Sequence, residues 1–200
     1  MAEKTPMMQQ YLEIKEQNKD AILFFRLGDF YEMFCDDAVL ASQELDLTLT
    51  SRDRGKPKED QVPMCGVPFH SVDSYIARLV AKGYKVAICE QTEDPAQAKG
   101  LVKRDIIRVV TPGTVDSSML EGSRSNYISS LWLEGDRAAA CFCDVTTGKA
   151  HATAFSGKDL ISHMVNEVGR YAPVEAIVSQ EVWDCRELMG LLQDKLHCRS

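Results

Sequence analysis

Long apolar runs are the first feature that this 200-residue chain lacks. No stretch approaches the length that spans a bilayer, and the polar start MAEKTP is not the basic and then apolar leader of an exported protein. We therefore expect neither a membrane-spanning helix nor a secretory leader. With 44% hydrophobic and 26% charged residues, the chain can form one large or two small globular domains.

Metal-binding and disulfide patterns are also missing. The seven cysteines are an odd count without any Cys-x-x-Cys pair, and the four histidines are scattered along the chain. Cys141 and Cys143 alternate within an expected strand, where thiols more often pack than bind metal. We therefore expect free thiols in a reducing cytoplasm and no metal site.

An excess of positive charge is absent as well, which argues against a basic nucleic-acid-binding domain. Residues 1–116 carry 15 basic and 19 acidic side chains, and residues 117–200 carry 8 and 11. Two local basic patches remain, at residues 52–58 and 99–108. Solvated loops would explain both patches. So small a footprint also fits a protein that touches DNA with one part of a larger clamp.

The chain does contain an unusual pair of side chains, Phe30 and Glu32. The apolar residues 21–27 predict a strand, and the Gly-Asp dipeptide after them supplies a tight hairpin turn, because Gly accepts a positive φ. If residues 30–34 form the returning strand, Phe30 and Glu32 point to the same face. A nucleic-acid base satisfies both, since the ring needs an apolar surface to stack on and the carboxylate needs a donor.

Two simpler interpretations compete with this one. Clusters of Phe and Tyr usually belong to a core. Asp29 and Glu32 also have the spacing of a helix capping box, and a helix beginning near Phe30 would place Phe30 and Glu32 about 160° apart. We favour the hairpin because Asp36 and Asp37 give a second helix start directly before an apolar-periodic segment.

The expected elements of residues 1–114 interleave helices and strands, which predicts a mixed α/β domain. We expect helices over residues 6–19, 36–46 and 71–83, and strands over residues 21–27, 30–34, 47–50, 84–90 and 106–110. Residues 52–61 predict a loop, and residues 63–68 are too rich in proline for regular structure. Residues 115–124 have the composition of a linker.

Residues 125–200 predict a second domain with another order of elements. Three strands are expected first, at residues 127–133, 138–145 and 149–155, followed by a helix at 158–171, a strand at 176–179 and a helix over 181–196. This β-β-β-α-β-α order resembles a ribonuclease H-like fold. The chain ends without a closing strand, so we expect this domain to be incomplete.

Ribonuclease H-like folds often hold metal ions on carboxylates, so a metal-dependent nuclease is one alternative function. Asp144 is the candidate carboxylate, but no second acid lies plainly opposite it, and a lone acid before Thr-Thr-Gly is more often a turn residue. A purely protein-docking module is the other alternative, in which Phe30 belongs to the core.

Five motifs in the first half of the chain resemble the MutS family of bacterial DNA mismatch-recognition proteins in order and spacing. They are TPMMQQY at residues 5–11, GDFYEMF at 28–34, PMCGVP at 63–68, VAICEQ at 86–91 and VTPGT at 110–114. Residues 125–200 resemble the connector domain of the family more loosely. The chain is thus similar to the N-terminal part of such a protein.

The resemblance implies a role for the Phe-x-Glu motif. Phe30 would stack on a mispaired or unpaired base from the minor groove, and Glu32 would hydrogen-bond the same base. It also places the loop that contains Met64 near the minor groove. The remaining expected contacts are with DNA phosphates, and their candidates are Arg52, Arg54, Lys103 and Arg104.

The resemblance further implies partners and cofactors. The partners are double-stranded DNA with mismatches or small loops, a second copy in a homodimer, and a MutL-type protein bound by the connector domain. ATP and Mg would bind to an ATPase domain in the C-terminal part of the family's proteins. No G-x-x-x-x-G-K-[ST] occurs in this chain, so we expect no enzyme activity and no cofactor here. The expected location is the cytoplasm, with the nucleoid when DNA is bound.

Overall fold

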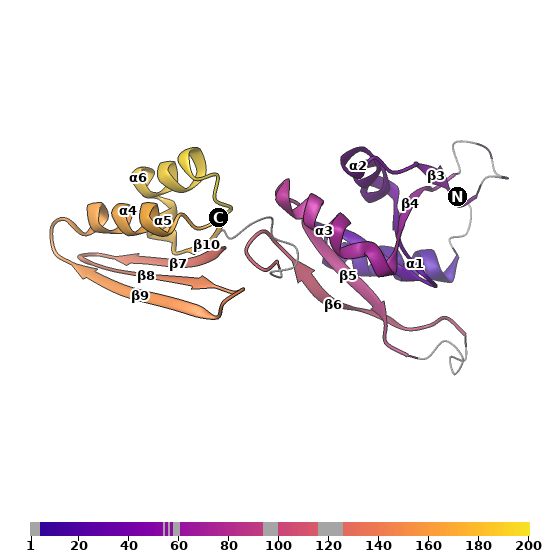
Figure 1. Cartoon of the computed structure of the whole chain (residues 1–200), viewed down its shortest axis with the longest axis horizontal. Coiled ribbons are helices and arrows are strands. Elements are labelled where there is room, and N and C mark those ends of the chain that lie inside the picture. Colours follow the sequence, from indigo (N-terminus) through magenta and orange to yellow (C-terminus); the bar gives the residue numbers. More distant parts are fainter. Residues whose placement is uncertain (1–4, 54, 56, 58–60, 94–99, 116–125) are drawn as a thin grey trace. The chain divides into compact units, whose positions relative to one another are not determined.

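The computed structural model describes residues 5–53, 55, 57, 61–93, 100–115 and 126–200 (Figure 1). The chain divides into two compact units, Met1–Thr111 and Pro112–Ser200. The expected linker at residues 115–124 lies, apart from Val115, outside the described residues. No helix in the described ranges is both long and apolar enough to cross a membrane.

A six-stranded mixed sheet forms the centre of the first unit, with strand order β3-β4-β2-β1-β5-β6. β1 runs parallel to β5, and every other neighbouring pair is antiparallel. The strands are β1 Ala21–Leu27, β2 Phe30–Phe34, β3 Thr50–Ser51, β4 Pro63–Pro68, β5 Lys85–Gln91 and β6 Arg104–Val110. The helices are α1 Pro6–Gln17, α2 Cys35–Leu45, η2 Phe69–Ser71 and α3 Val72–Ala81.

Helix α1 covers one face of this sheet. It begins as its sequence predicts, because Thr5 Oγ1 accepts a hydrogen bond from the Met8 N–H at 3.4 Å and a proline occupies the first turn. Tyr11 lies edge-on to Phe25 and Phe34, with ring centroids 5.4 and 5.0 Å away. α2 contacts β4 from the other face, and α3 lies beside α2. The sheet is therefore buried on both sides over most of its area.

The predicted hairpin between β1 and β2 is confirmed. Leu27 pairs with Phe30 in an antiparallel register, and Gly28 in the turn has a φ of 57°. The capping-box interpretation is wrong, because the next helix begins at Cys35 and Asp29 belongs to the turn.

Two predictions about the neighbouring strands need correction. The proline-rich PMCGVP stretch is the regular strand β4, paired with both β2 and β3. Its prolines stand at the first and last positions, where a missing N–H costs the ladder little. The strand expected at residues 47–50 is wrong in its extent, because only Thr50 and Ser51 pair. Leu49, at 45% exposure, has no sheet surface to cover it.

A four-stranded sheet with order β10-β7-β8-β9 forms the second unit. β10 runs parallel to β7, and the other neighbours are antiparallel. The strands are β7 Tyr127–Glu134, β8 Arg137–Asp144, β9 Lys149–Ser156 and β10 Glu175–Val178. The helices, which lie on one face of the sheet in Figure 1, are α4 Leu160–Tyr171, α5 Gln180–Trp183, α6 Arg186–Met189 and η4 Gly190–Lys195. This order confirms the predicted mixed α/β class.

The single long helix predicted over residues 181–196 is wrong. The chain breaks at Cys185, whose extended backbone separates α5 from α6, and the last turns form a π-helix. Val182 and Leu188 are both fully buried. In one continuous helix these two positions would point about 120° apart, so the break lets both reach the same core.

Candidate nucleic-acid interface

Strand β2 presents three side chains in a row on the face that α1 partly covers: Phe30, Glu32 and Phe34. Phe34 is fully buried, and its backbone C=O and N–H are both within 3.3 Å of the Tyr11 hydroxyl. Glu32 is intermediate, with 18% of its side chain exposed. Phe30 is 46% exposed. The row thus runs from a buried end under α1 to a solvent-exposed ring beside the hairpin turn.

The exposed ring of Phe30 stands between two paired strands. Leu27 lies opposite it on β1, and Pro68 lies opposite it on β4. Both neighbours are partly buried and apolar. Because β2 is hydrogen-bonded on both edges, the backbone of Phe30 is fixed while its ring is free to contact another molecule.

Glu32 has room for its side chain because Gly66 lies opposite it on β4. A Cβ atom at position 66 would lie 3.4 Å from Glu32 Cγ and 3.2 Å from the Tyr31 backbone oxygen. Sequence reasoning missed Gly66 as a site residue. An isolated glycine within a strand is the signal that could have found it, but that signal required residues 63–68 to be read as a strand.

The carboxyl group of Glu32 is poorly satisfied. Its Oε2 atom is buried, and within the described part of the chain no hydrogen bond reaches it. The guanidinium of Arg52 is nearest, with Nη1 3.5 Å from Oε2. Burial raises the pKa of Glu32 above its usual range, and the charge of Arg52 opposes that rise. Such a group can accept a hydrogen bond from a donor or, once protonated, can donate one.

The other predicted contact residues are dispersed. Arg52 lies beside Glu32, with 41% of its side chain exposed. Met64 is opposite Phe34 and is a partly buried residue that packs against the buried cluster under α1. Lys103 is exposed next to Asp105, at an Nζ to Oδ2 distance of 3.1 Å, at the start of the edge strand β6. Arg54 lies outside the described residues.

Arg104 is not the surface residue that its basic neighbourhood predicts. Only 6% of it is exposed, and its guanidinium donates to the Arg26 backbone oxygen at 2.8 Å and to Gln10 Oε1 at 3.0 Å. The cation also lies 5.0 Å from the ring centroid of Phe25. The reason is that β6 begins at Arg104 and its pairing with Gln91 turns the side chain toward α1. In this fold the guanidinium of Arg104 is thus buried and hydrogen-bonded to oxygen atoms of the protein.

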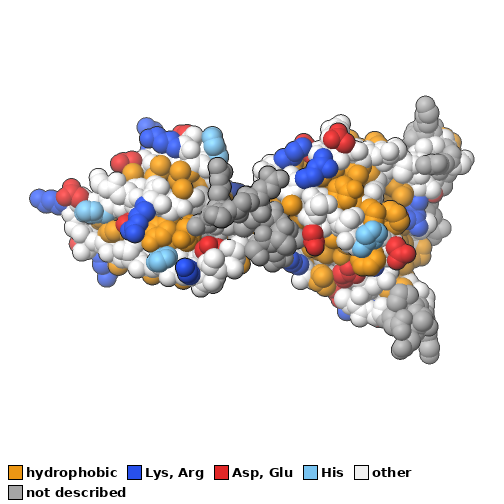
Figure 2. Space-filling model, in the orientation of Figure 1, with side chains coloured by type: hydrophobic (Ala, Val, Ile, Leu, Met, Phe, Trp, Pro, Cys, Tyr) orange, Lys and Arg blue, Asp and Glu red, His pale blue; other side chains and the backbone are white. Residues whose placement is uncertain are grey.

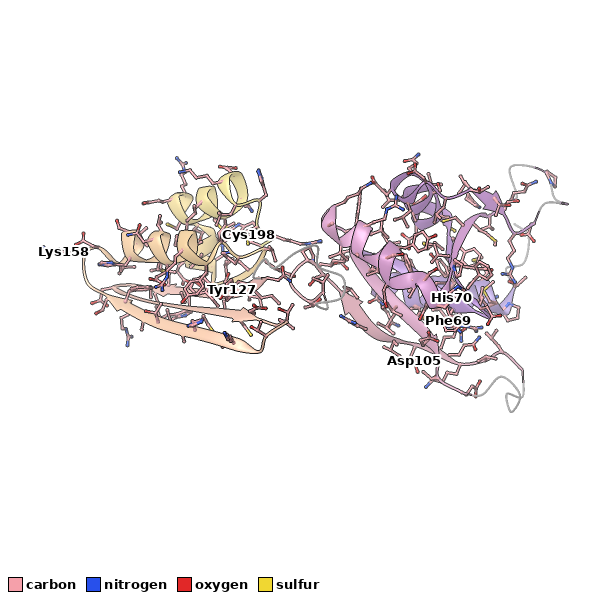
Figure 3. The ribbon with its side chains drawn as sticks, in the orientation of Figure 1. Phe69, His70, Asp105, Tyr127, Lys158 and Cys198 are labelled. Carbon is pink, nitrogen blue, oxygen red and sulfur yellow. The ribbon has the colours of Figure 1, made fainter. Side chains whose placement is uncertain are left out.

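The opposite face of the hairpin is buttressed by an arginine between aromatic rings. Arg26 Cζ lies 3.8 Å from the ring centroid of Phe69, and the Tyr31 hydroxyl donates to the Glu90 carboxylate. The Phe69 N–H donates to the backbone oxygen of Asp29 in the turn at 2.9 Å. Figure 3 shows Phe69 beside His70 at this end of the unit. These contacts hold the turn in place behind Phe30.

The electrostatic footprint of the described surface is small. On the face drawn in Figure 2, Lys and Arg side chains are scattered among acidic and hydrophobic ones rather than gathered in one field. This distribution agrees with the acidic net charge of −7. On this face, a contact with DNA phosphates would therefore involve a few separate groups rather than one basic field.

Asp144, the candidate carboxylate of the nuclease alternative, has the geometry of a turn residue. Its Oδ1 accepts hydrogen bonds from the Thr146 N–H at 3.0 Å and the Thr146 hydroxyl at 2.6 Å. These bonds lower the pKa of Asp144. Among the described residues no group of three or more His, Cys, Asp or Glu side chains could hold a metal ion.

Comparison with known proteins places this chain in a family. The family model described as MutS domain I matches residues 5–119, and the model described as MutS domain II matches residues 126–199. The chain belongs to the MutS family. Its two units are the mismatch-recognition domain and the connector domain of that family, which confirms the resemblance found in the sequence.

In several relatives, about half of the residues in the aligned region are identical to those of this chain. The DNA mismatch repair protein MutS of Ruminiclostridium cellulolyticum is 54% identical over 198 residues, covering 98% of this chain and 22% of the relative. The protein of that name from Acetivibrio thermocellus is 54% identical over 196 residues, with coverages of 98% and 22%. That of Clostridium tetani is 56% identical over 180 residues, with coverages of 89% and 20%. The chain spans about a fifth of the length of these MutS proteins.

Proposed function

We propose that this MutS chain recognises mispaired or unpaired bases in duplex DNA through Phe30 and Glu32. Phe30 enters from the minor groove and stacks on the base, and Glu32 hydrogen-bonds the same base. The observation that carries the proposal is the 46% exposure of a phenylalanine ring fixed on a strand beside a carboxyl oxygen without a hydrogen bond in the described chain. A core phenylalanine would be covered, and a surface glutamate would be hydrated.

The wedge gives selectivity through the deformability of DNA. Pushing a ring between base steps costs a few kcal/mol of unstacking, and this cost is lower where pairing is already defective. The hydrogen-bond pattern of the minor groove is degenerate, so readout of base edges there distinguishes little. Phe30 therefore tests how easily a step opens rather than which bases it contains.

Glu32 adds discrimination by electrostatics. A carboxylate beside phosphates is unfavourable, so Glu32 must find a donor on the base or carry a proton. The raised pKa of Glu32 makes the proton easier to acquire than on an exposed glutamate. An ordinary stacked base pair offers Glu32 no hydrogen-bond partner within reach, so binding to matched DNA is weaker.

Phosphate contacts position the duplex in this proposal. Lys103 and Arg54 remain candidates for these phosphate contacts. Met64 remains a candidate for a position near the minor groove. Arg52 stands apart from them because its guanidinium already faces Glu32.

The relatives are much longer than this chain, and the activity of a whole MutS protein is a separate proposal. We infer that a full-length MutS protein with this N-terminal part acts as a homodimeric clamp around DNA. Its ATPase, which depends on ATP and Mg, would lie elsewhere in its sequence. The connector domain would dock a MutL-type partner. The location would be the cytoplasm, at the nucleoid when DNA is bound.

The test compares binding of a G·T or unpaired-T duplex with binding of a matched duplex, at low salt because the chain offers few phosphate contacts. Phe30→Ala should abolish the preference for the defective duplex while the chain stays folded. Trp132→Ala is the matched control, because Trp132 is also a large exposed ring, at 40%, but lies in the second unit. An unchanged preference in Phe30→Ala would refute the wedge.

Folding is checked by thermal melting of the same variants. Phe34→Ala, which truncates a fully buried ring, should cost about 3–5 kcal/mol. Phe30→Ala should cost far less. If Phe30→Ala unfolds the chain as Phe34→Ala does, the ring of Phe30 belongs to the core. That result would favour the alternative function, a purely protein-docking module.

A further inference from the structure

Arg52 covers one end of the Phe30, Glu32 and Phe34 row. Its Nη1 atom lies 3.5 Å from Glu32 Oε2, and its Cζ lies 6.0 Å from the ring centroid of Phe34. Both contacts are on the face of β2 that carries Phe30. The cation thus sits over the carboxyl group that the proposed function assigns to the base, while Phe30 stays open.

The backbone of Arg52 is held by a hydrogen bond, whereas its side chain is partly exposed to solvent. The Arg52 N–H donates to the Val62 backbone oxygen at 3.3 Å, directly after the two paired residues of β3. The side chain is 41% exposed. An ion pair this exposed contributes little free energy, so the guanidinium can swing away from Glu32 without a large cost.

The ion pair between Arg52 and Glu32 does not include a hydrogen bond. Oε2 of Glu32 is buried, and 3.5 Å without hydrogen-bond geometry leaves it unsatisfied among the described residues. A buried acceptor without a donor is unfavourable. A base that donates to this oxygen, or accepts from its protonated form, would remove that penalty but would need the space that the guanidinium faces.

No other charge competes for this role within the described chain. The strands that flank Glu32 present Phe25 on β1 and Gly66 on β4. Arg104 lies over Phe25 but is committed to Gln10 and backbone oxygens. Among the described residues, Arg52 is the charged group that opposes the rise in the pKa of Glu32.

We propose that Arg52 clamps Glu32 in the DNA-free protein and releases it when a base takes its place, so that Arg52 sets how strongly the site rejects paired DNA. The proposal rests on the proposed function of Phe30 and Glu32. It replaces the expected phosphate contact by Arg52 with a positioning role. Its positive charge favours the ionised form of Glu32 until a base takes its place, and an ionised Glu32 repels an ordinary duplex.

The direct test is a double-mutant cycle on binding, with Arg52→Met, Glu32→Gln and the pair together. Arg52→Met should narrow the ratio of defective to matched affinity by about two- to fivefold, the range that a part-exposed ion pair supplies. In the Glu32→Gln background the same change should have no effect on the ratio, because no ionised carboxyl remains to be clamped. Arg52→Lys should restore part of the ratio.

Arg78→Met is the matched control for lost charge. Arg78 is also about half exposed and pairs with Asp46 at 3.7 Å, on α3. It should leave the ratio of affinities unchanged in both backgrounds.

A second measurement needs no DNA. The Glu32 carboxyl carbon, followed by nuclear magnetic resonance during a pH titration of the free chain, should show a higher pKa in Arg52→Met than in the wild type. An unchanged pKa would overturn the clamp whatever the binding data show.

Phosphate contact is the competing result. Arg52→Met would then weaken binding to matched and defective duplexes equally, in both backgrounds, and would lower the salt slope by about one. That outcome refutes the proposed action of Arg52 on Glu32 but leaves the proposed roles of Phe30 and Glu32 intact. Failure of the proposed function is distinct, because Phe30→Ala would then leave the wild-type preference intact.

Discussion

Gly66 shapes the site by having no side chain. It lies opposite Glu32 in the β2 and β4 ladder, and a Cβ there would meet Glu32 Cγ at 3.4 Å and the Tyr31 oxygen at 3.2 Å. The second distance is tighter than an ordinary van der Waals contact, so the neighbouring strand must shift by a few tenths of an ångström. Such a shift would displace the carboxyl of Glu32 relative to the ring of Phe30, and the two could then no longer meet one base as proposed.

We expect Gly66→Ala to reduce the preference for a defective duplex while costing only about 1 kcal/mol of stability. Competition binding and urea unfolding of the same preparation measure the two effects. Gly169→Ala in α4 is the control, because its added methyl meets nothing within 4 Å and removes a flexible residue from a helix. Equal binding ratios in both variants would mean that Gly66 plays no part in the site.

The raised pKa of Glu32 has a consequence for stability. The folded chain holds a proton on this carboxyl more tightly than the unfolded chain does, because burial raises the pKa of Glu32. The free energy of unfolding therefore falls as the pH rises from the usual carboxyl range through the higher folded pKa.

Glu32→Gln should remove this dependence. We expect the variant to be more stable than the wild type near neutral pH, with a difference that shrinks when the solution is acidified below both pKa values. Urea unfolding at several pH values gives the comparison. A difference that is constant with pH would show that Glu32 titrates like an exposed carboxyl group.

At the scale of elements, the hairpin between β1 and β2 is the part of the site that sequence predicts best. The apolar run, the Gly-Asp turn and the alternation of residues 30–34 are all local signals, and each points to the same structure. The helix α1 is equally local, since Thr5 and Pro6 mark its start. These elements needed no knowledge of the rest of the chain.

The sequence does not predict features whose structure depends on residues far away in the chain. The strand β4 contains two prolines and a glycine, and it is ordered by β2 and β3 on its two edges. Arg104 lies in a basic stretch that suggests solvent, and only pairing with β5 turns it inward. The contact between Arg52 and Glu32 likewise joins the residue that follows β3 to a residue of β2, which no local pattern reports.

Gly28→Ala tests the hairpin as a unit. Gly28 has a φ of 57° and open space around it, so the added methyl costs only backbone strain, about 1–2 kcal/mol. The variant should lose stability by that amount and should bind a defective duplex less tightly, because the turn no longer fixes Phe30. Gly28→Asn should recover most of the stability, since Asn tolerates this backbone region. Thermal melting that ranks Asn with Ala would contradict this account.

At the scale of the whole molecule, each unit has a core of its own. Leu131, Phe142 and Met164 are buried in the second unit, and the residues around Tyr11 and Phe34 are buried in the first. Stability and recognition can therefore be perturbed separately.

Met164→Ala should destabilise the second unit by about 2–5 kcal/mol, because Met164 is fully buried. It should leave the preference for a defective duplex unchanged below the melting temperature. Hydrogen exchange resolved by residue measures the local stability, and the binding assay of Phe30→Ala measures the preference. Loss of protection in β2 of Met164→Ala would show that the two cores are coupled.

The position of β2 inside the sheet has a mechanical consequence. β2 is paired on both edges, its turn has two residues, and the Arg26 and Phe69 stack stands behind that turn. If Phe30 acts on DNA as proposed, a ring held this rigidly moves little when it presses on a duplex, and the base step deforms instead. Under the proposed function, the contribution of Phe30 to selectivity then follows the local flexibility of the base step, and Glu32 adds to it.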